Sequence, residues 1–176
     1  MKVKNYSTFW AILIMYACLV PITYLGISQL GVSLLPDKNA LLSFPTIWHY
    51  FTWTASWWNV LLGVLIVILV CNEYAFKTQR QNVIDGLSKR EMILGKFLFI
   101  IALAAAVALY AFVVACITGL IFDGAENFTR KLEYVPIYGL QTVGYFAFAF
   151  LLATLVKRPA LSIILYIVII AIDLFL

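Results

Sequence analysis

Apolar positions follow one another in long continuous runs along this chain, and short polar stretches separate the runs. Continuous runs, without the two-residue alternation of half-buried strands, predict helices in an apolar solvent. Each run approaches the roughly 20 residues that a helix needs to cross a bilayer. We therefore predict an all-α fold, a polytopic helical membrane bundle in which residues 1–176 form one transmembrane domain. Its five membrane-crossing helices are expected at residues 9–30, 48–71, 97–122, 134–156 and 160–176.

Composition supports the membrane as the solvent of this chain. Hydrophobic residues make up 65% of the sequence and charged residues 11%, with a mean hydropathy of +1.03. Backbone N–H and C=O groups in lipid must be satisfied within the protein, which again favours helices. The three cysteines are few and widely spaced in or beside apolar runs, so they indicate neither a disulfide framework nor a zinc site.

The basic residues predict an orientation in the membrane. With the N-terminus in the cytoplasm, nine of the twelve Lys and Arg residues lie on the cytoplasmic side, as the positive-inside rule requires. These residues flank apolar runs and form no stripe with exposed aromatics, so we expect lipid headgroups and no nucleic acid among the partners. The nine are Lys2, Lys4, Lys77, Arg80, Lys89, Arg90, Lys96, Lys157 and Arg158.

The longest polar stretch, residues 72–96, separates the second and third apolar runs and carries five basic residues. Residues 73–84 contain no Gly or Pro and predict an amphipathic helix at the membrane surface that prolongs the second span. Gly86 is expected to end that helix. Ser88 and Glu91 have the spacing of a capping box, which predicts a new helix that continues through Lys96 into the third span.

At these residues the chain resembles the type-2 ABC transporter permeases. The likeness lies in the segment EYAFKTQRQNVIDGLSKREMILGK, in the span order and in the orientation. It implies that residues 72–96 form the cytoplasmic coupling segment, which docks on a separate ATPase subunit. Family members usually have six spans, so we expect at least one further span beyond Leu176. The resemblance assigns ATPase coupling to Glu73, Thr78, Arg80, Gly86, Ser88 and Arg90, and it also includes Lys96.

The function implied by this resemblance is the transmembrane permease subunit of an ATP-driven ABC exporter. The chain lacks the G-x-x-x-x-G-K-[ST] loop that cradles phosphates, so ATP is expected on the partner subunit, with no enzymatic activity and no cofactor on this chain. A homodimer, or a heterodimer with another permease, is expected in the cytoplasmic membrane of a bacterium. The alternative is a non-transporting scaffold or sensor that docks a cytoplasmic protein through residues 73–95.

Individual polar residues invite further predictions. Asp173 lies about 20 Å of helical rise beyond Pro159, deep in the fifth span, and is a candidate intramembrane polar site. Glu73 is expected to pair with a basic residue of segment 72–96 or of the partner, and Lys77, four residues later, has the spacing of a weak helical ion pair. We assign Arg80 and Arg90 to the ATPase, whereas lipid headgroups explain Lys89 and Lys96 at least as well.

The start of the second span is rich in aromatic residues, which predicts an interfacial aromatic belt rather than a ligand box. His49, the only histidine, belongs to this region and is expected to be interfacial. An intramembrane enzyme is disfavoured, because the single His49 and the single Asp173 supply no catalytic set. Pro21 is expected to bend the first span, and Pro159 to open the fifth. The belt comprises Trp48, Tyr50, Phe51, Trp53, Trp57 and Trp58.

Overall fold

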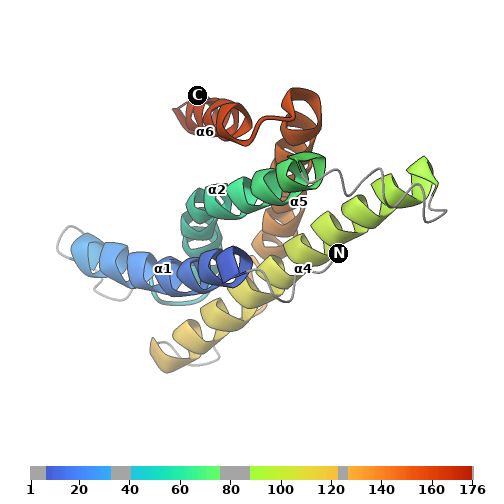
Figure 1. The fold of residues 1–176 in the computed structure, drawn as a ribbon. Coiled ribbons are helices and arrows are strands. Elements are labelled where there is room, and N and C mark those ends of the chain that lie inside the picture. The colour runs from blue at the N-terminus through green and yellow to red at the C-terminus, as the bar shows by residue number, and fades with distance from the viewer. Residues whose placement is uncertain (1–6, 33–40, 76–87, 123–126, 176) are drawn as a thin grey trace. The chain divides into compact units, whose positions relative to one another are not determined.

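The structure is a computed structural model that describes residues 7–32, 41–75, 88–122 and 127–175. Within these ranges the chain forms five helices and no strand, which confirms the predicted all-α class (Figure 1). The helices are α1 (Ser7–Val32), α2 (Thr46–Ala75), α4 (Lys89–Phe122), α5 (Tyr134–Val156) and α6 (Pro159–Phe175).

Among the described residues, four helices, α1, α2, α4 and α5, are long and apolar enough to cross a membrane, so the chain is a multi-pass membrane protein. The fifth, α6, has 17 residues and is shorter than the roughly 20 that a perpendicular crossing needs. With 34 residues, α4 extends for about 51 Å, well beyond the ~30 Å hydrocarbon core. Its polar residues Arg90, Glu91 and Lys96 indicate that the N-terminal turns project from the lipid.

Local sequence rules explain the turn between α5 and α6. Lys157 takes a left-handed conformation, with φ of 58°, and its N–H donates to the Ala153 carbonyl at 3.1 Å. A left-handed residue after the last turn is a common way for a helix to end. Pro159 is the first residue of α6, as predicted, because proline lacks the N–H that a first helical turn leaves unpaired.

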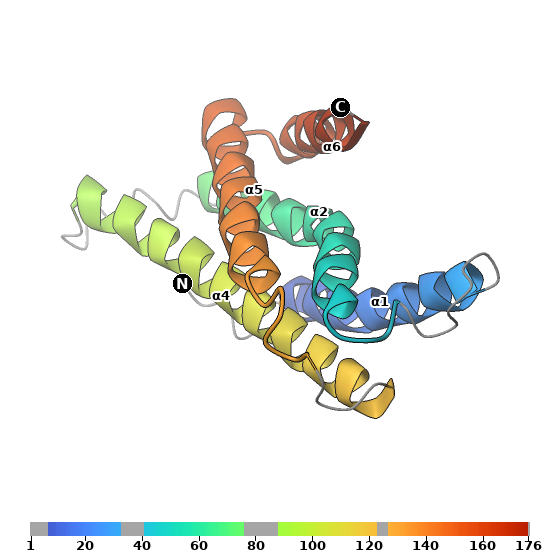
Figure 2. The ribbon, with the colours of Figure 1, turned by 180° about the vertical axis from the view of Figure 1, so that it is seen from behind.

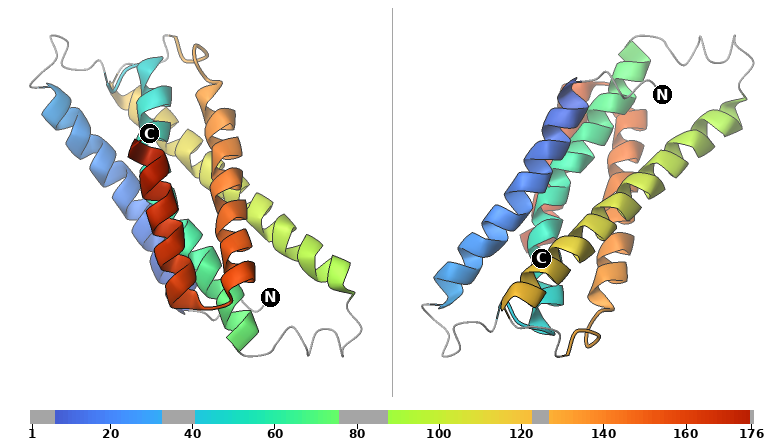
Figure 3. Two further views of the ribbon diagram at one scale, coloured as in Figure 1. Left: turned by 90° about the horizontal axis from the view of Figure 1, so that it is seen from above. Right: turned by 90° about the horizontal axis from the view of Figure 1, so that it is seen from below.

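The chain divides into two compact units, which are described separately. Unit 1 comprises residues Met1–Asn59 and Ala105–Thr142, and unit 2 comprises Val60–Ala104 and Val143–Leu176. In unit 1, α1 lies beside the first half of α2 (Figure 3), where the Trp58 indole donates to the Thr23 hydroxyl at 3.0 Å. The core of unit 1 includes four fully buried residues of α2, namely Ile47, Trp48, Phe51 and Ala55.

The aromatic residues at the start of α2 do not all form a belt. Trp48 is fully buried, stacks on Phe112 with ring centroids 5.6 Å apart, and donates its indole N–H to the Phe128 carbonyl at 3.0 Å. Phe51 is also buried, whereas Trp53 and Trp57 are exposed. The belt prediction is therefore wrong for Trp48 and Phe51, because tertiary packing in unit 1 takes these two side chains into the core.

Helix α1 continues through Pro21 without a break. Proline has no N–H, so the carbonyl of Ala17, four residues earlier, loses its usual helical partner. The Tyr110 hydroxyl of α4 donates to this carbonyl at 2.5 Å. A backbone acceptor that the proline leaves open is thus satisfied by a side chain from another helix of unit 1.

In unit 2, a short turn joins α5 to α6 (Figure 2), and α6 packs against the second half of α2. A Cβ on Gly63 would lie 2.0 Å from the Tyr166 hydroxyl oxygen, so any larger residue here would displace the buried Tyr166 side chain. Nearer the end of α2, the Cys71 sulfur lies 3.9 Å from the Ala153 carbonyl oxygen and 4.0 Å from the Ser162 hydroxyl oxygen. The end of α2 therefore contacts both α5 and α6.

Candidate functional site

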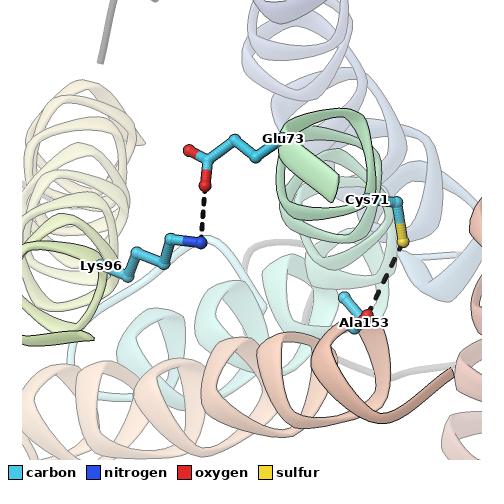
Figure 4. Close-up of polar contacts among 4 residues, drawn as sticks. All are labelled: Cys71, Glu73, Lys96 and Ala153. Carbon is cyan, nitrogen blue, oxygen red and sulfur yellow. Dashed lines mark hydrogen bonds and ion pairs between the residues drawn. The ribbon is translucent and has the colours of Figure 1, made fainter. Parts of the chain in front are cut away.

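An ion pair joins the two helices that flank the predicted coupling segment. The Lys96 ammonium lies 2.6 Å from a Glu73 carboxylate oxygen, and the two side chains are 14% and 21% exposed (Figure 4). Glu73 belongs to the last turn of α2 and Lys96 to the third turn of α4. The sequence separation is 23 residues, so the contact depends on how the helices of unit 2 pack.

Aromatic rings surround the ammonium group of this pair. The Lys96 Nζ atom lies 5.8 Å from the centroid of the Tyr74 ring and 5.9 Å from that of Phe150. Lys157, in the turn between α5 and α6, also lies 5.8 Å from the Tyr74 ring. Cations over aromatic faces are attracted by the ring quadrupole. These five residues, here called the Lys96 cluster, connect one end of α2 with α4, α5 and the α5–α6 turn.

The capping box at the start of α4 is present as the sequence predicts. The Ser88 backbone N–H donates to a Glu91 carboxylate oxygen at 2.8 Å, and the Glu91 N–H donates to the Ser88 hydroxyl at 3.3 Å. The backbone hydrogen bond from Ser88, followed by its side-chain hydrogen bond, lowers the pKa of the exposed Glu91 carboxyl. Both bonds satisfy donors that a helix start leaves open, which fixes where α4 begins.

The other predicted coupling residues have different outcomes. Thr78, Arg80 and Gly86, and with them the surface helix and its glycine end, lie outside the described residues. Arg90 is exposed in the first turn of α4, where a partner or lipid could reach it. Asp173 falls within α6, but its side chain lies outside the described part.

The ion pair of Glu73 bears on the interpretation of Lys96. The predicted pair of Glu73 with Lys77 stays a prediction, because Lys77 lies outside the described residues, and Glu73 forms an ion pair with Lys96. Lys96 therefore holds two helices together, a role that the lipid-headgroup interpretation had missed. The signal in the sequence was weak, since it consists only of an acid at the end of one apolar run and a base at the start of the next.

A second polar group, in unit 1, consists entirely of uncharged side chains. The Tyr16 and Tyr138 hydroxyl groups lie 2.8 Å apart, and the Tyr138 hydroxyl donates to the Asn59 carbonyl oxygen at 3.1 Å. The Asn59 amide donates to the Thr142 hydroxyl at 3.0 Å. All four residues are at most 3% exposed. We call them the Asn59 network; it links α1, α2 and α5.

Sequence reasoning missed the Asn59 network, although a signal existed. Asn59 is a strongly polar amide in the middle of an apolar run, and such a group requires partners at membrane depth. The identity of those partners, Tyr138 and Thr142, could not be read from the chain. Among the described residues, no group of three His, Cys, Asp or Glu side chains is arranged to hold a metal ion.

A scan against models of protein families, a search of curated proteins and a search of solved structures each found no match. The resemblance to type-2 ABC permeases therefore stays a prediction that depends on the residues of the segment 72–96.

Proposed function

We propose that this chain is the membrane-spanning permease subunit of an ATP-driven exporter, and that residues 72–96 receive force from a separate ATPase subunit. We infer, as part of this proposal, that α6 is a fifth span and that the N-terminus faces the cytoplasm. A second permease, identical or different, completes the translocating dimer. ATP binds only to the partner subunits.

The single observation that carries the proposal is the ion pair between Glu73 and Lys96. It joins the last turn of α2 to the early turns of α4, on either side of residues 76–87. A force applied between these two helices would therefore act on both together rather than bend one of them. Through Tyr74, the same force would reach Lys157 and the α5–α6 turn.

The capping box supports the same role. Because the hydrogen bonds between Ser88 and Glu91 define the first turn of α4, the helix is ordered right up to the segment that is expected to dock. A frayed first turn would absorb displacement, whereas a capped turn transmits it along the helix axis.

The test measures ATP hydrolysis that purifies with the tagged protein from its native membranes. We expect vanadate-sensitive hydrolysis with the wild-type chain. Glu73→Lys and Lys96→Glu should each reduce it several-fold, because each leaves two like charges within about 3 Å, which is strongly unfavourable. The double charge exchange should restore part of the activity. Arg130→Glu, on an exposed residue of unit 1, is the matched control and should have no effect.

Two results would contradict the proposal. If no ATP hydrolysis purifies with the protein, the exporter assignment is wrong, and a bound partner without ATPase activity would favour the scaffold or sensor. If hydrolysis purifies with the protein but both single charge reversals behave as the wild type does, the Lys96 cluster has no part in coupling.

A further inference from the structure

A groove in unit 1 is lined by polar side chains of α2 and α5. It has a volume of about 150 Å³ and lies between the first half of α2 and the first half of α5. His49, Thr52 and Ser56 line it from α2, with the spacing of one helical face. Three residues of α5 with similar spacing line the other side, namely Tyr134, Tyr138 and Gln141.

The groove is lined by polar and aromatic side chains, and none of its lining residues is Asp, Glu, Lys or Arg. The Thr52 hydroxyl donates to the Trp48 carbonyl at 2.7 Å, and the Ser56 hydroxyl donates to the Trp53 carbonyl at 2.7 Å. Each hydroxyl proton is thus used by the helix backbone, and the oxygen retains acceptor capacity. Such a groove suits a ligand that donates hydrogen bonds and has no formal charge, such as an alcohol.

The polar residues of the groove lie several turns inside helices that are long and apolar enough to cross a membrane, which favours a bound ligand there. Ser56 and Gln141 lie roughly 15 and 10 Å of helical rise beyond the starts of α2 and α5. Polar surface at that depth is unfavourable against lipid hydrocarbon. The exposed side chains of Trp53 and Ile137 border the groove and offer apolar surface to a hydrocarbon tail.

One wall of the groove belongs to the Asn59 network and is therefore held in place. Tyr138 lines the groove, while its hydroxyl bonds to Tyr16 and Asn59. A wall fixed by buried hydrogen bonds is arranged before a ligand arrives, which lowers the entropic cost of binding. A volume near 150 Å³ is well above the roughly 10–15 Å³ that one water molecule requires, so a head group of several non-hydrogen atoms fits.

We propose that this groove binds the small, uncharged, hydroxyl-bearing head of an amphipathic molecule, whose tail lies along Trp53 and Ile137. This inference does not depend on the proposed exporter function, because binding can be measured without ATP or an ATPase. A second copy of this chain is the main competing occupant, and the experiment separates the two.

The experiment uses membranes that contain the protein and a 1-O-alkylglycerol with a photoreactive group in its tail. Labelled peptides are mapped by mass spectrometry, with 1-O-octylglycerol, octyl sulfate or octyltrimethylammonium as competitors. We expect labels on the parts of α2 and α5 that border the groove. The uncharged competitor should suppress them at least tenfold more effectively than either charged one.

Variants make the result specific to the groove. Ser56→Leu fills the space and should reduce labelling at least fivefold. Gln141→Leu and Thr52→Val remove one polar group each without adding bulk and should reduce labelling about threefold. These two variants carry the test if Ser56→Leu does not fold. Thr118→Val in α4 removes a similar helix-bonded hydroxyl away from the groove and should change nothing.

Three outcomes would overturn the inference. Labels spread evenly over lipid-facing helices, or equal suppression by all three competitors, would exclude a specific head-group site. Unchanged labelling in both Thr52→Val and Gln141→Leu would exclude their part in it. Efficient cross-linking of two chains through Ser56→Cys would show that a second copy covers the groove instead.

Discussion

The Asn59 network of unit 1 and the Lys96 cluster of unit 2 stabilise their units by different physical means. The network has four uncharged residues, at most 3% exposed, that are joined by directional hydrogen bonds. The cluster contains three charged residues, and the side chains of its ion pair are 14% and 21% exposed. Uncharged groups can be buried at low cost if they are paired, whereas charged groups in lipid cost several kcal/mol. We therefore expect the packing of unit 1 to be insensitive to salt, whereas the packing of unit 2 should change with the salt concentration and with bound partners.

Asn59→Leu should have the largest effect on stability. The leucine fits an apolar core, but Tyr138 loses its acceptor and Thr142 loses its donor. An unsatisfied buried polar group costs about 1–3 kcal/mol. We expect the free energy of unfolding in mild detergent to fall by about 2 kcal/mol. Thr154→Val, at a half-buried position of unit 2 whose hydroxyl donates to the Leu151 carbonyl of its own helix, is the control; an equal loss there would contradict the assigned role of the network.

The same chemical change should have opposite signs in the two units. Tyr138→Phe removes a hydroxyl with two partners in the Asn59 network and should destabilise the protein by about 1 kcal/mol. The Tyr166 hydroxyl of unit 2 is buried and has no hydrogen-bond partner among the described residues. Tyr166→Phe should therefore be neutral or stabilise by up to ~1 kcal/mol. Thermal unfolding of both variants measures the difference, and equal losses would refute it.

The ion pair of unit 2 should show a coupling energy that depends on the salt concentration. A double-mutant cycle on Glu73→Gln and Lys96→Met should give a coupling energy of about 1 kcal/mol, because both groups are partly exposed. Raising the salt concentration to 1 M should reduce this coupling, since the Debye length falls to ~3 Å. A parallel cycle on Tyr138→Phe and Asn59→Leu should be insensitive to salt. A salt-independent Glu73–Lys96 coupling would mean that the pair is buried from solvent.

The smallest effect concerns the capping box. The lowered pKa of Glu91 means that its stabilising contribution is complete above the ordinary value of 4.5 and disappears as the pH falls through the lowered value. In an NMR titration, the Ser88 amide proton should shift with a midpoint below 4.5. Ser88→Thr should preserve this midpoint and Ser88→Ala should raise it. An unchanged midpoint in Ser88→Ala would show that the Ser88 hydroxyl does not contribute to the lowered pKa of Glu91.

Local signals account for what the sequence predicted correctly. The α5 helix spans the predicted residues, Pro159 opens α6, and Ser88 and Glu91 form the capping box, because proline, capping residues and long apolar runs act within a few residues. The Glu73–Lys96 pair and the partners of Asn59 could not be predicted, since packing between helices sets them. The prediction for Trp48 was wrong for the same reason. Its neighbours in the sequence are typical of an interfacial aromatic belt, whereas packing between helices buries its side chain in the core of unit 1.

The proline of α1 has a consequence for how unit 1 can move. The Ala17 carbonyl, which Pro21 leaves without its usual backbone N–H, accepts the Tyr110 hydroxyl and is a point of contact between α1 and α4. A slide of α1 against α4 by one turn, about 5.4 Å, would separate the two groups and leave both without a partner. The hydrogen bond from Tyr110 to the carbonyl that Pro21 leaves open therefore helps to set the register between these two helices.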